Sequence, residues 1–213
     1  MNSIQVNWWG DYLPVILFFQ MKIGILISGR GSNMVAIVDA VQSGEIPDSE
    51  AVVVISDKAD VAGLTKALER GVEAVVVERN GRKRTEHDVE IISELSKRGV
   101  ELVCLAGYMR LLSPSFVLAF PNRIINIHPS LLPAFPGLDA QRQAFDAGVE
   151  TTGCTVHYVD ELLDHGPVIL QREVKRLADD TVETLSARIL EQEHPLYVAA
   201  IRRLATETTG DSE

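Results

Sequence analysis

Cysteine is scarce in this sequence, which has two among 213 residues. Cys104 and Cys154 both lie in apolar runs, so they have neither the spacing of metal ligands nor the density of a disulfide framework. Basic residues are also outnumbered, and the net charge of -10 disfavours a broad electrostatic surface for nucleic acid. These features favour a reduced, cytoplasmic protein that binds any phosphate group through local donors.

Long hydrophobic runs are missing as well. The apolar stretch Leu13 to Phe19 is too short to cross a bilayer, and it lacks the basic region and cleavage site of a signal peptide. Met21 follows and opens the strand-like segment KIGILIS. We therefore expect residues 1–20 to be a mispredicted extension, with a natural surface arm as the alternative. Residues 21–213 then form one domain, without a membrane partner.

Continuous apolar segments alternate with helical patterns along the first two thirds of the chain. Strands that are apolar throughout need cover on both faces, so the fold class is α/β, with a mostly parallel sheet flanked by helices on both faces and a Rossmann-like N-terminal half. The later strands alternate like those of a mixed sheet edge. Strands are expected at 23–28, 51–56, 72–78, 100–107, 123–128, 153–160 and 166–174. Helices are expected at 34–44, 61–71, 89–99, 113–120, 139–148 and 181–207, the last with an interruption near Pro195.

The glycine-rich segment SGRGSN, residues 28–33, follows the first expected strand. Glycines permit a tight turn, and the start of a helix offers unpaired N–H groups, so the loop has the geometry of a phosphate site. It is not a Walker A loop, because no Gly-Lys-Ser/Thr follows, and Met34 replaces the third glycine of a dinucleotide fingerprint. The alternative is a plain turn with Ser32 as the N-cap.

Two polar side chains interrupt the apolar strand in IINIHPSLLPAFPG. Because side chains alternate along a strand, Asn126 and His128 point to one face while Ile125 and Ile127 pack on the other. An amide N–H can donate to a developing oxyanion, and an imidazole can move a proton near neutral pH. The alternative is a histidine that makes only structural hydrogen bonds at a strand end.

An acidic loop, DELLDHGPV, lies further along at residues 160–168. Such a loop is usually a solvated turn. Asp164 could instead lie opposite His128, where a carboxylate would orient the imidazole and favour its charged form.

Five segments in fixed order resemble the phosphoribosylglycinamide formyltransferases of purine biosynthesis, which use 10-formyltetrahydrofolate. They are SGRGSN, AGYMRLLSP, NIHPSLLPAFPG, GCTVHYVDELLDHGPVILQ and EQEHP, and the resemblance runs from about Met21 to Ala205. Several formyltransferases share the HPSLLP segment, so that segment is specific for the chemistry and not for the substrate. The glycine loop and the EHP segment narrow the resemblance to enzymes that act on glycinamide ribonucleotide. The resemblance implies formyl transfer from this folate to the amine of glycinamide ribonucleotide, with no metal.

The resemblance also implies a set of site residues. Catalysis would fall to Asn126, His128 and Asp164. The substrate phosphate would contact Gly31, Ser32 and Asn33, and the ribose hydroxyls would contact Glu193. The folate would contact an apolar slot, the backbone near Arg110 and the 161–164 loop, with a basic residue near its glutamate tail; the residues are Leu105, Met109, Arg110, Leu111, Leu112, Val117, Glu161 and Arg84.

Some residues depart from the pattern of the family, and others are interpreted as structural. Leu190 stands where the family often has a polar phosphate contact, and His165 replaces a common glycine. We interpret His157 as structural support for the site. His87 and His194 are interpreted as helix-surface or packing residues, although His194 could orient the neighbouring Glu193.

Other function classes remain as alternatives. A methionyl-tRNA formyltransferase would add a C-terminal domain and favour a basic surface. A formyltetrahydrofolate hydrolase would share the three catalytic residues, and a non-enzymatic folate or nucleotide sensor would not need them together. The expected partners are small molecules, and the assembly is a monomer or a homodimer.

Overall fold

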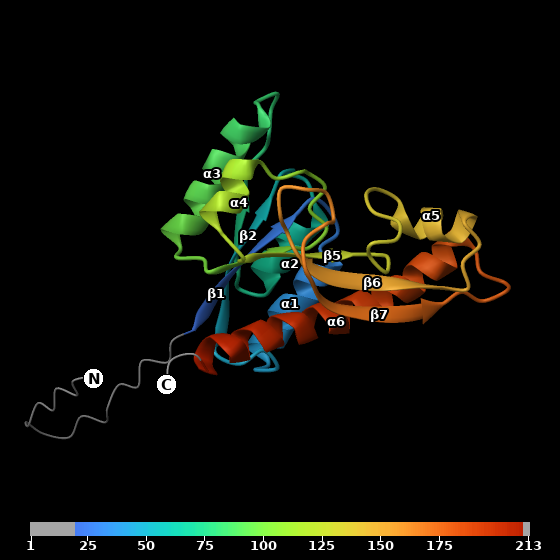
Figure 1. Ribbon diagram of the computed structural model, residues 1–213. Helices are drawn as coiled ribbons and strands as arrows, with labels where there is room; N and C mark the ends of the chain where they lie inside the picture. The colour runs from blue at the N-terminus through green and yellow to red at the C-terminus, as the bar shows by residue number, and fades with distance from the viewer. Residues whose placement is uncertain (1–19, 211–213) are drawn as a thin grey trace, which may run out of the picture.

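The structure is a computed structural model that describes residues 20–210, so the expectation for residues 1–20 lies outside the described residues apart from Gln20. A seven-stranded sheet forms its centre (Figure 1). The strands are β1 Met21–Ile27, β2 Ser49–Ser56, β3 Glu73–Val76, β4 Leu102–Leu105, β5 Ile124–His128, β6 Thr151–Tyr158 and β7 Val168–Lys175. The helices are α1 Ser32–Gln42, α2 Ala62–Glu69, α3 Arg84–Lys97, α4 Pro114–Ala119, α5 Ala140–Asp146 and α6 Val182–Gly210.

The strand order is β3-β2-β1-β4-β5-β6-β7. The first five strands pair in parallel, whereas β6 and β7 pair antiparallel at one edge. After β3 at one edge of the sheet, the chain returns to the centre and β4 pairs with β1. The direction in which strands are added therefore reverses between β1 and β4, and a crevice lies at the carboxyl ends of these two strands. The predicted mostly parallel α/β sheet is confirmed.

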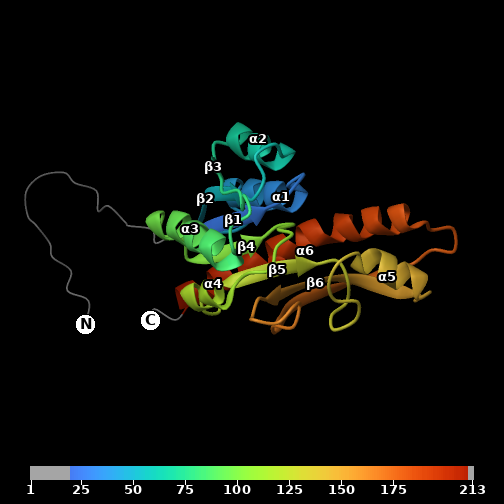
Figure 2. The ribbon, with the colours of Figure 1, turned by 90° about the horizontal axis from the view of Figure 1, so that it is seen from above.

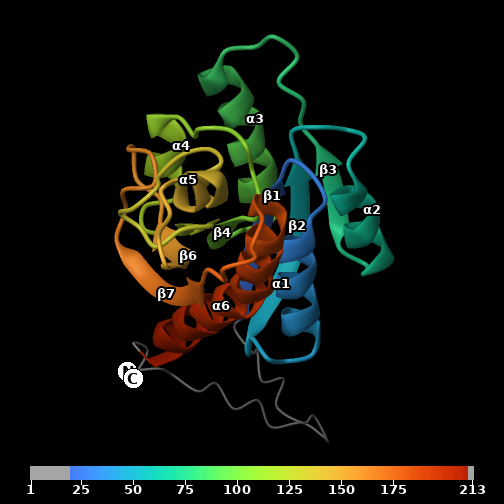
Figure 3. The same cartoon turned by 90° about the vertical axis from the view of Figure 1, so that its right-hand side faces the viewer.

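Helices cover both faces of the sheet, with α1 and α6 on one side and α3 and α4 on the other (Figures 1 and 3). Each face has its own apolar core. Ile25, Ile125 and Ile127 pack in the core beneath α1 and α6, and Leu26 and Leu105 pack in the core beneath α3 and α4. Continuous apolar strands are buried on both faces, which explains why they lack alternation.

Helix α6 is continuous, so the expected interruption near Pro195 is wrong. Proline removes only one backbone donor from the helix, and buried side chains on both sides of it, including Ile189 and Tyr197, hold the helix against the sheet. The Tyr197 hydroxyl lies 3.2 and 3.0 Å from the carbonyl oxygens of Leu105 and Ile125. The helix runs alongside β6 (Figure 2) and thereby reaches the carboxyl ends of the central strands.

Several element boundaries differ from the expected ones, and those of α3 and β3 are two examples. Helix α3 begins at Arg84 and not at residue 89, because Glu86 accepts a hydrogen bond from the backbone N–H of Lys83 at 3.1 Å and caps a polar first turn that has no apolar periodicity. Strand β3 is shorter than residues 72–78. Among the described helices, none is both long and apolar enough to cross a membrane.

Candidate active site

The glycine loop joins β1 to α1 at the crevice. Gly31 is the N-cap of α1 and has a φ of 70°, and a Cβ atom there would lie 2.9 Å from the Cα of Gly63. Ser32 is the first helical residue, so the alternative in which Ser32 caps the helix is wrong. Within residues 20–210 no side chain caps α1, which leaves the first N–H groups of the helix open to a ligand.

Neighbouring elements fix this loop by hydrogen bonds. The N–H of Ser28 donates to the carbonyl of Gly107 at 3.1 Å, and its hydroxyl accepts from the N–H of Met109 at 2.9 Å. The N–H of Gly63 donates to the carbonyl of Gly29 at 3.1 Å. The loops after β1 and β4 are therefore held together at the point where the strand order reverses.

A cavity of about 670 Å³ opens beside the glycine loop. The side-chain nitrogen of Asn33 donates to Oε2 of Glu193 at 2.7 Å, and both residues are buried. Burial raises the pKa of Glu193, while the hydrogen bond from Asn33 opposes that shift. The cavity thus combines open N–H groups for an anion with a carboxylate that can accept hydrogen bonds. Its lining comprises Ser28, Gly29, Arg30, Gly31, Ser32, Asn33, Ala106, Gly107, Met109, Ile127, Pro129, Gln141, Glu183, Ser186, Ala187, Leu190 and Glu193.

Asn126 lies on β5 directly opposite His157 of β6. Nδ1 of His157 donates to the carbonyl of Tyr158 at 2.8 Å, so Nε2 carries the lone pair that accepts from Nδ2 of Asn126 at 3.2 Å. Burial lowers the pKa of His157, which keeps this acceptor neutral. His157 therefore fixes the Asn126 amide with its nitrogen toward β6 and leaves a second N–H for a ligand.

His128 ends β5 and lies close to the acidic loop. Its Nε2–H donates to the carbonyl of Phe135 at 2.9 Å, and its Nδ1 lies 3.4 Å from Oδ2 of Asp164. Because a carbonyl can only accept, Nε2 carries a hydrogen, and Nδ1 is the ring nitrogen that faces the carboxylate. The sequence expectation that His128 faces Asp164 matches this geometry.

Asp164 lies between the two histidines. Its Oδ1 is 3.7 Å from Nε2 of His157, and its Oδ2 accepts from the N–H of Gly137 at 2.8 Å. The side chain is 9% exposed, and the backbone has a φ of 48°. Asn126, His128, His157 and Asp164 thus form one connected polar cluster, held from β5, β6 and the loop that follows β6.

The residues expected around the folate do not all lie together in the structure. Leu105, Leu112 and Val117 share the core beneath α3 and α4. Met109 and Leu111 are 65% and 56% exposed, and Met109 lines the cavity beside the glycine loop instead of this apolar group. The slot predicted from the sequence is therefore only partly assembled from the expected side chains.

Arg110 does more than present its backbone. Its guanidinium pairs with the buried carboxylate of Asp57, which follows β2. Glu161 and Arg84 are exposed, the latter at the first turn of α3. Sequence reasoning missed Asp57 because a single acidic residue after a strand has no distinguishing pattern.

The remaining singled-out histidines lie outside the polar cluster. Nδ1 of His165 lies 2.9 Å from Oδ2 of Asp160 in the acidic loop. His87 is buried in α3 and donates to the carbonyl of Val77 at 2.6 Å, which is a packing position. His194 is partly buried on α6, and burial lowers its pKa. In the described part of the chain, no group of three or more metal-ligating side chains is gathered.

Comparison with known proteins gives a consistent result. A family model described as formyl transferase matches residues 21–201. A phosphoribosylglycinamide formyltransferase of Escherichia coli is 43% identical over 182 residues, which is 85% of each chain. The crystal structure of glycinamide ribonucleotide transformylase 1 from Symbiobacterium toebii has a TM-score of 0.87 and 50% identity, and the match covers 93% of each chain.

Longer relatives also match. A trifunctional purine biosynthetic protein adenosine-3 of Drosophila pseudoobscura pseudoobscura is 46% identical over 187 residues. The chain spans only 14% of the length of that relative, so the comparison concerns one part of a larger protein.

Proposed function

The chain belongs to the formyl transferase family, and from this premise we propose that it transfers the formyl group of 10-formyltetrahydrofolate to the amine of glycinamide ribonucleotide. The products would be formylglycinamide ribonucleotide and tetrahydrofolate, in purine biosynthesis. The observation that carries this proposal is the cluster of Asn126, His128 and Asp164 at the carboxyl end of β5, next to the cavity that holds the glycine loop.

The cavity supports a substrate that has both a phosphate and a diol. The open N–H groups from Gly31 to Asn33 suit a phosphate, and Glu193 suits ribose hydroxyls because a carboxylate accepts two hydrogen bonds. Ile127 and Pro129, the neighbours of His128, line the same cavity. A nucleotide bound along it would therefore bring its amine to the end of β5.

The polar cluster supports acyl transfer. The amine nitrogen attacks the formyl carbon, and the carbonyl oxygen becomes an oxyanion. The free N–H of Asn126 donates to that oxygen, and the imidazolium of His128 stabilises its charge. As the bond from the formyl carbon to N10 breaks, the amine loses one proton and N10 gains one. We assign the relay of this proton to Asp164 and His128, since Nδ1 of His128 lies 3.4 Å from Oδ2 of Asp164.

The apolar group near α4 suits a flat ring of the second substrate. Leu105, Leu112 and Val117 lie on the face of the sheet toward which Asn126 and His128 point, because Ile125 and Ile127 occupy the opposite core. We assign the folate to this side. Arg110, Leu111 and the 161–164 loop would border it.

The setting of the reaction is part of the proposal. We infer small-molecule substrates in a reduced cytoplasm, with the chain as a monomer or a homodimer. Cys104 and Cys154 are both free and buried, and burial raises the pKa of the Cys154 thiol to about 12. Unreactive buried thiols are compatible with that compartment.

The decisive experiment offers 10-formyltetrahydrofolate to the purified chain together with glycinamide ribonucleotide, water alone or methionyl-tRNA. We expect formyl transfer to the nucleotide to dominate. Release of formate without an acceptor would favour a hydrolase, and transfer to tRNA would favour the other formyltransferase class.

Replacing His128 with alanine tests whether the activity depends on this site. We expect the turnover to fall by about a hundredfold to ten-thousandfold, because the proton-handling group is lost, while both substrates still bind. A fall of about tenfold or less would contradict the proposed role of His128.

A further inference from the structure

Arg30 has no part in the catalytic cluster but lies in the glycine loop. It is exposed, and it lines the cavity next to Gly31 and Ser32. Among residues 20–210 no carboxylate lies within 4.0 Å of its guanidinium, whereas Arg70, Arg98 and Arg188 each form an ion pair. Arg30 is therefore a cation that faces a ligand cavity without a protein partner.

The charge of the cavity makes this cation unusual. Of the charged side chains in the described lining, Arg30 is the positive one, and Glu183 and Glu193 are negative. The whole chain has a net charge of -10. A phosphate dianion that enters this cavity would meet two carboxylates, so its binding requires a local positive charge as well as backbone N–H groups.

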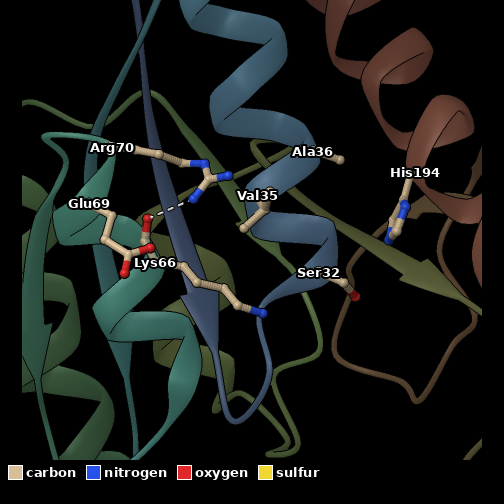
Figure 4. A pocket seen from close by; sticks show the side chains of 7 residues that line it. All are labelled: Ser32, Val35, Ala36, Lys66, Glu69, Arg70 and His194. Atoms are coloured by element: carbon tan, nitrogen blue, oxygen red, sulfur yellow. Dashed lines mark hydrogen bonds between the residues drawn. The ribbon is translucent and has the colours of Figure 1, made fainter.

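The loop holds the Arg30 backbone in place. Nζ of Lys66 donates to the carbonyl oxygen of Arg30 at 2.9 Å. Figure 4 shows Lys66 reaching from α2 toward the start of α1, on the side of a neighbouring hollow that Ser32 and His194 also line. Lys66 lines the neighbouring hollow and not this cavity, so Arg30 remains the cation among the lining residues of the cavity.

We propose that Arg30 binds the phosphate group of the nucleotide substrate, together with the open N–H groups at the start of α1. Its planar fork can donate two parallel hydrogen bonds to phosphate oxygens. Leu190 lies in the same lining and has no donor, so Arg30 supplies the charged contact that α6 does not. This inference rests on the proposed function, because it assumes a phosphate-bearing substrate.

Steady-state kinetics of Arg30→Ala tests the inference. We expect the KM for glycinamide ribonucleotide to rise about 10- to 100-fold, since a charge-assisted contact is lost, without a matching rise in the KM for the folate. Arg30→Lys should give a smaller rise, because it keeps the charge and loses the fork. Arg123→Ala is the matched control, since it removes an exposed arginine at the opposite, amino-terminal end of β5.

A substrate without phosphate locates the contact. With glycinamide riboside in place of the ribonucleotide, the difference between the wild-type protein and Arg30→Ala should disappear. The inference is overturned if the nucleotide KM of Arg30→Ala equals that of Arg123→Ala, or if the difference persists with the riboside. Absence of formyl transfer by the wild-type protein would instead overturn the proposed function, so the two failures are distinguishable.

Discussion

Nδ2 of Asn126 and Nε2 of His157 lie 3.2 Å apart, across the antiparallel pair of β5 and β6. His157 uses its other ring nitrogen on the carbonyl of Tyr158, so it can only accept from the amide. The histidine thereby decides which end of the Asn126 side chain faces a ligand. A flipped amide would present oxygen to a developing oxyanion and repel it.

His157→Leu should therefore lower the turnover by about 10- to 100-fold, because the amide is no longer held in the donating orientation. The KM of either substrate should change little. His157→Gln can still accept a hydrogen bond and should recover much of the loss. Steady-state kinetics of both variants checks this, and equal turnover in the two would mean that His157 acts only through packing.

Asp164 has two separable contacts, one with the imidazole of His128 and one with the N–H of Gly137. Asp164→Asn keeps an oxygen that can accept from Gly137 and removes the negative charge. We expect the turnover to fall by about a hundredfold with little change in the folate KM, since proton relay is lost and the loop is kept.

Asp164→Ala loses both contacts, and its folate KM should rise as well. The two variants are compared by their KM values and by their melting temperatures. If Asp164→Asn retained the wild-type turnover, Asp164 would act as a loop anchor and not in proton transfer.

The sequence predicted those parts of the site that follow from a single strand. Alternation placed Asn126 and His128 on one face, and the apolar runs predicted a parallel sheet whose carboxyl ends bring the glycine loop and β5 together. These features depend on local periodicity, which any strand carries in its own residues.

Other contacts depend on pairing between segments and could not be read from local patterns. The position of His157 opposite Asn126 follows from the register of β6 on β5. Asp164 lies in a loop and reaches His128 from a backbone with a φ of 48°, a conformation that no periodicity in the sequence indicates. The polar first turn of α3 was missed because helix patterns are recognised from their apolar residues.

Glu193 connects the nucleotide cavity to pH. Burial raises its pKa above the ordinary value of 4.5, so the carboxylate takes up a proton at a higher pH than a free glutamate does. The protonated form accepts hydrogen bonds poorly. We therefore expect the nucleotide KM to rise as the pH falls toward this raised pKa, while the folate KM does not follow.

Glu193→Gln should raise the nucleotide KM by about tenfold at neutral pH and remove this part of its pH dependence. The substrate phosphate titrates equally with both proteins, so the difference between their KM profiles isolates Glu193. If the folate KM rose and the nucleotide KM did not, Glu193 would contact the folate and not the nucleotide, against this prediction.

The pairing of Asp57 with Arg110 links β2 to the loop after β4, which borders the proposed folate side. The Asp57 side chain is 1% exposed and that of Arg110 is 32% exposed. The chain offers a matched pair elsewhere: Asp180 and Arg188 are 2% and 29% exposed, at the start of α6. The two pairs have similar side-chain exposures and border different parts of the molecule.

Asp57→Asn keeps the side-chain volume and removes the charge that holds Arg110. We expect the melting temperature to fall by a few degrees and the folate KM to rise about tenfold, because the loop after β4 shifts against the second substrate. Asp180→Asn should lower the melting temperature comparably and leave the folate KM at its wild-type value. If both variants left the folate KM unchanged, the Asp57 pair would stabilise the fold without positioning the loop, since loss of stability alone is common to both substitutions.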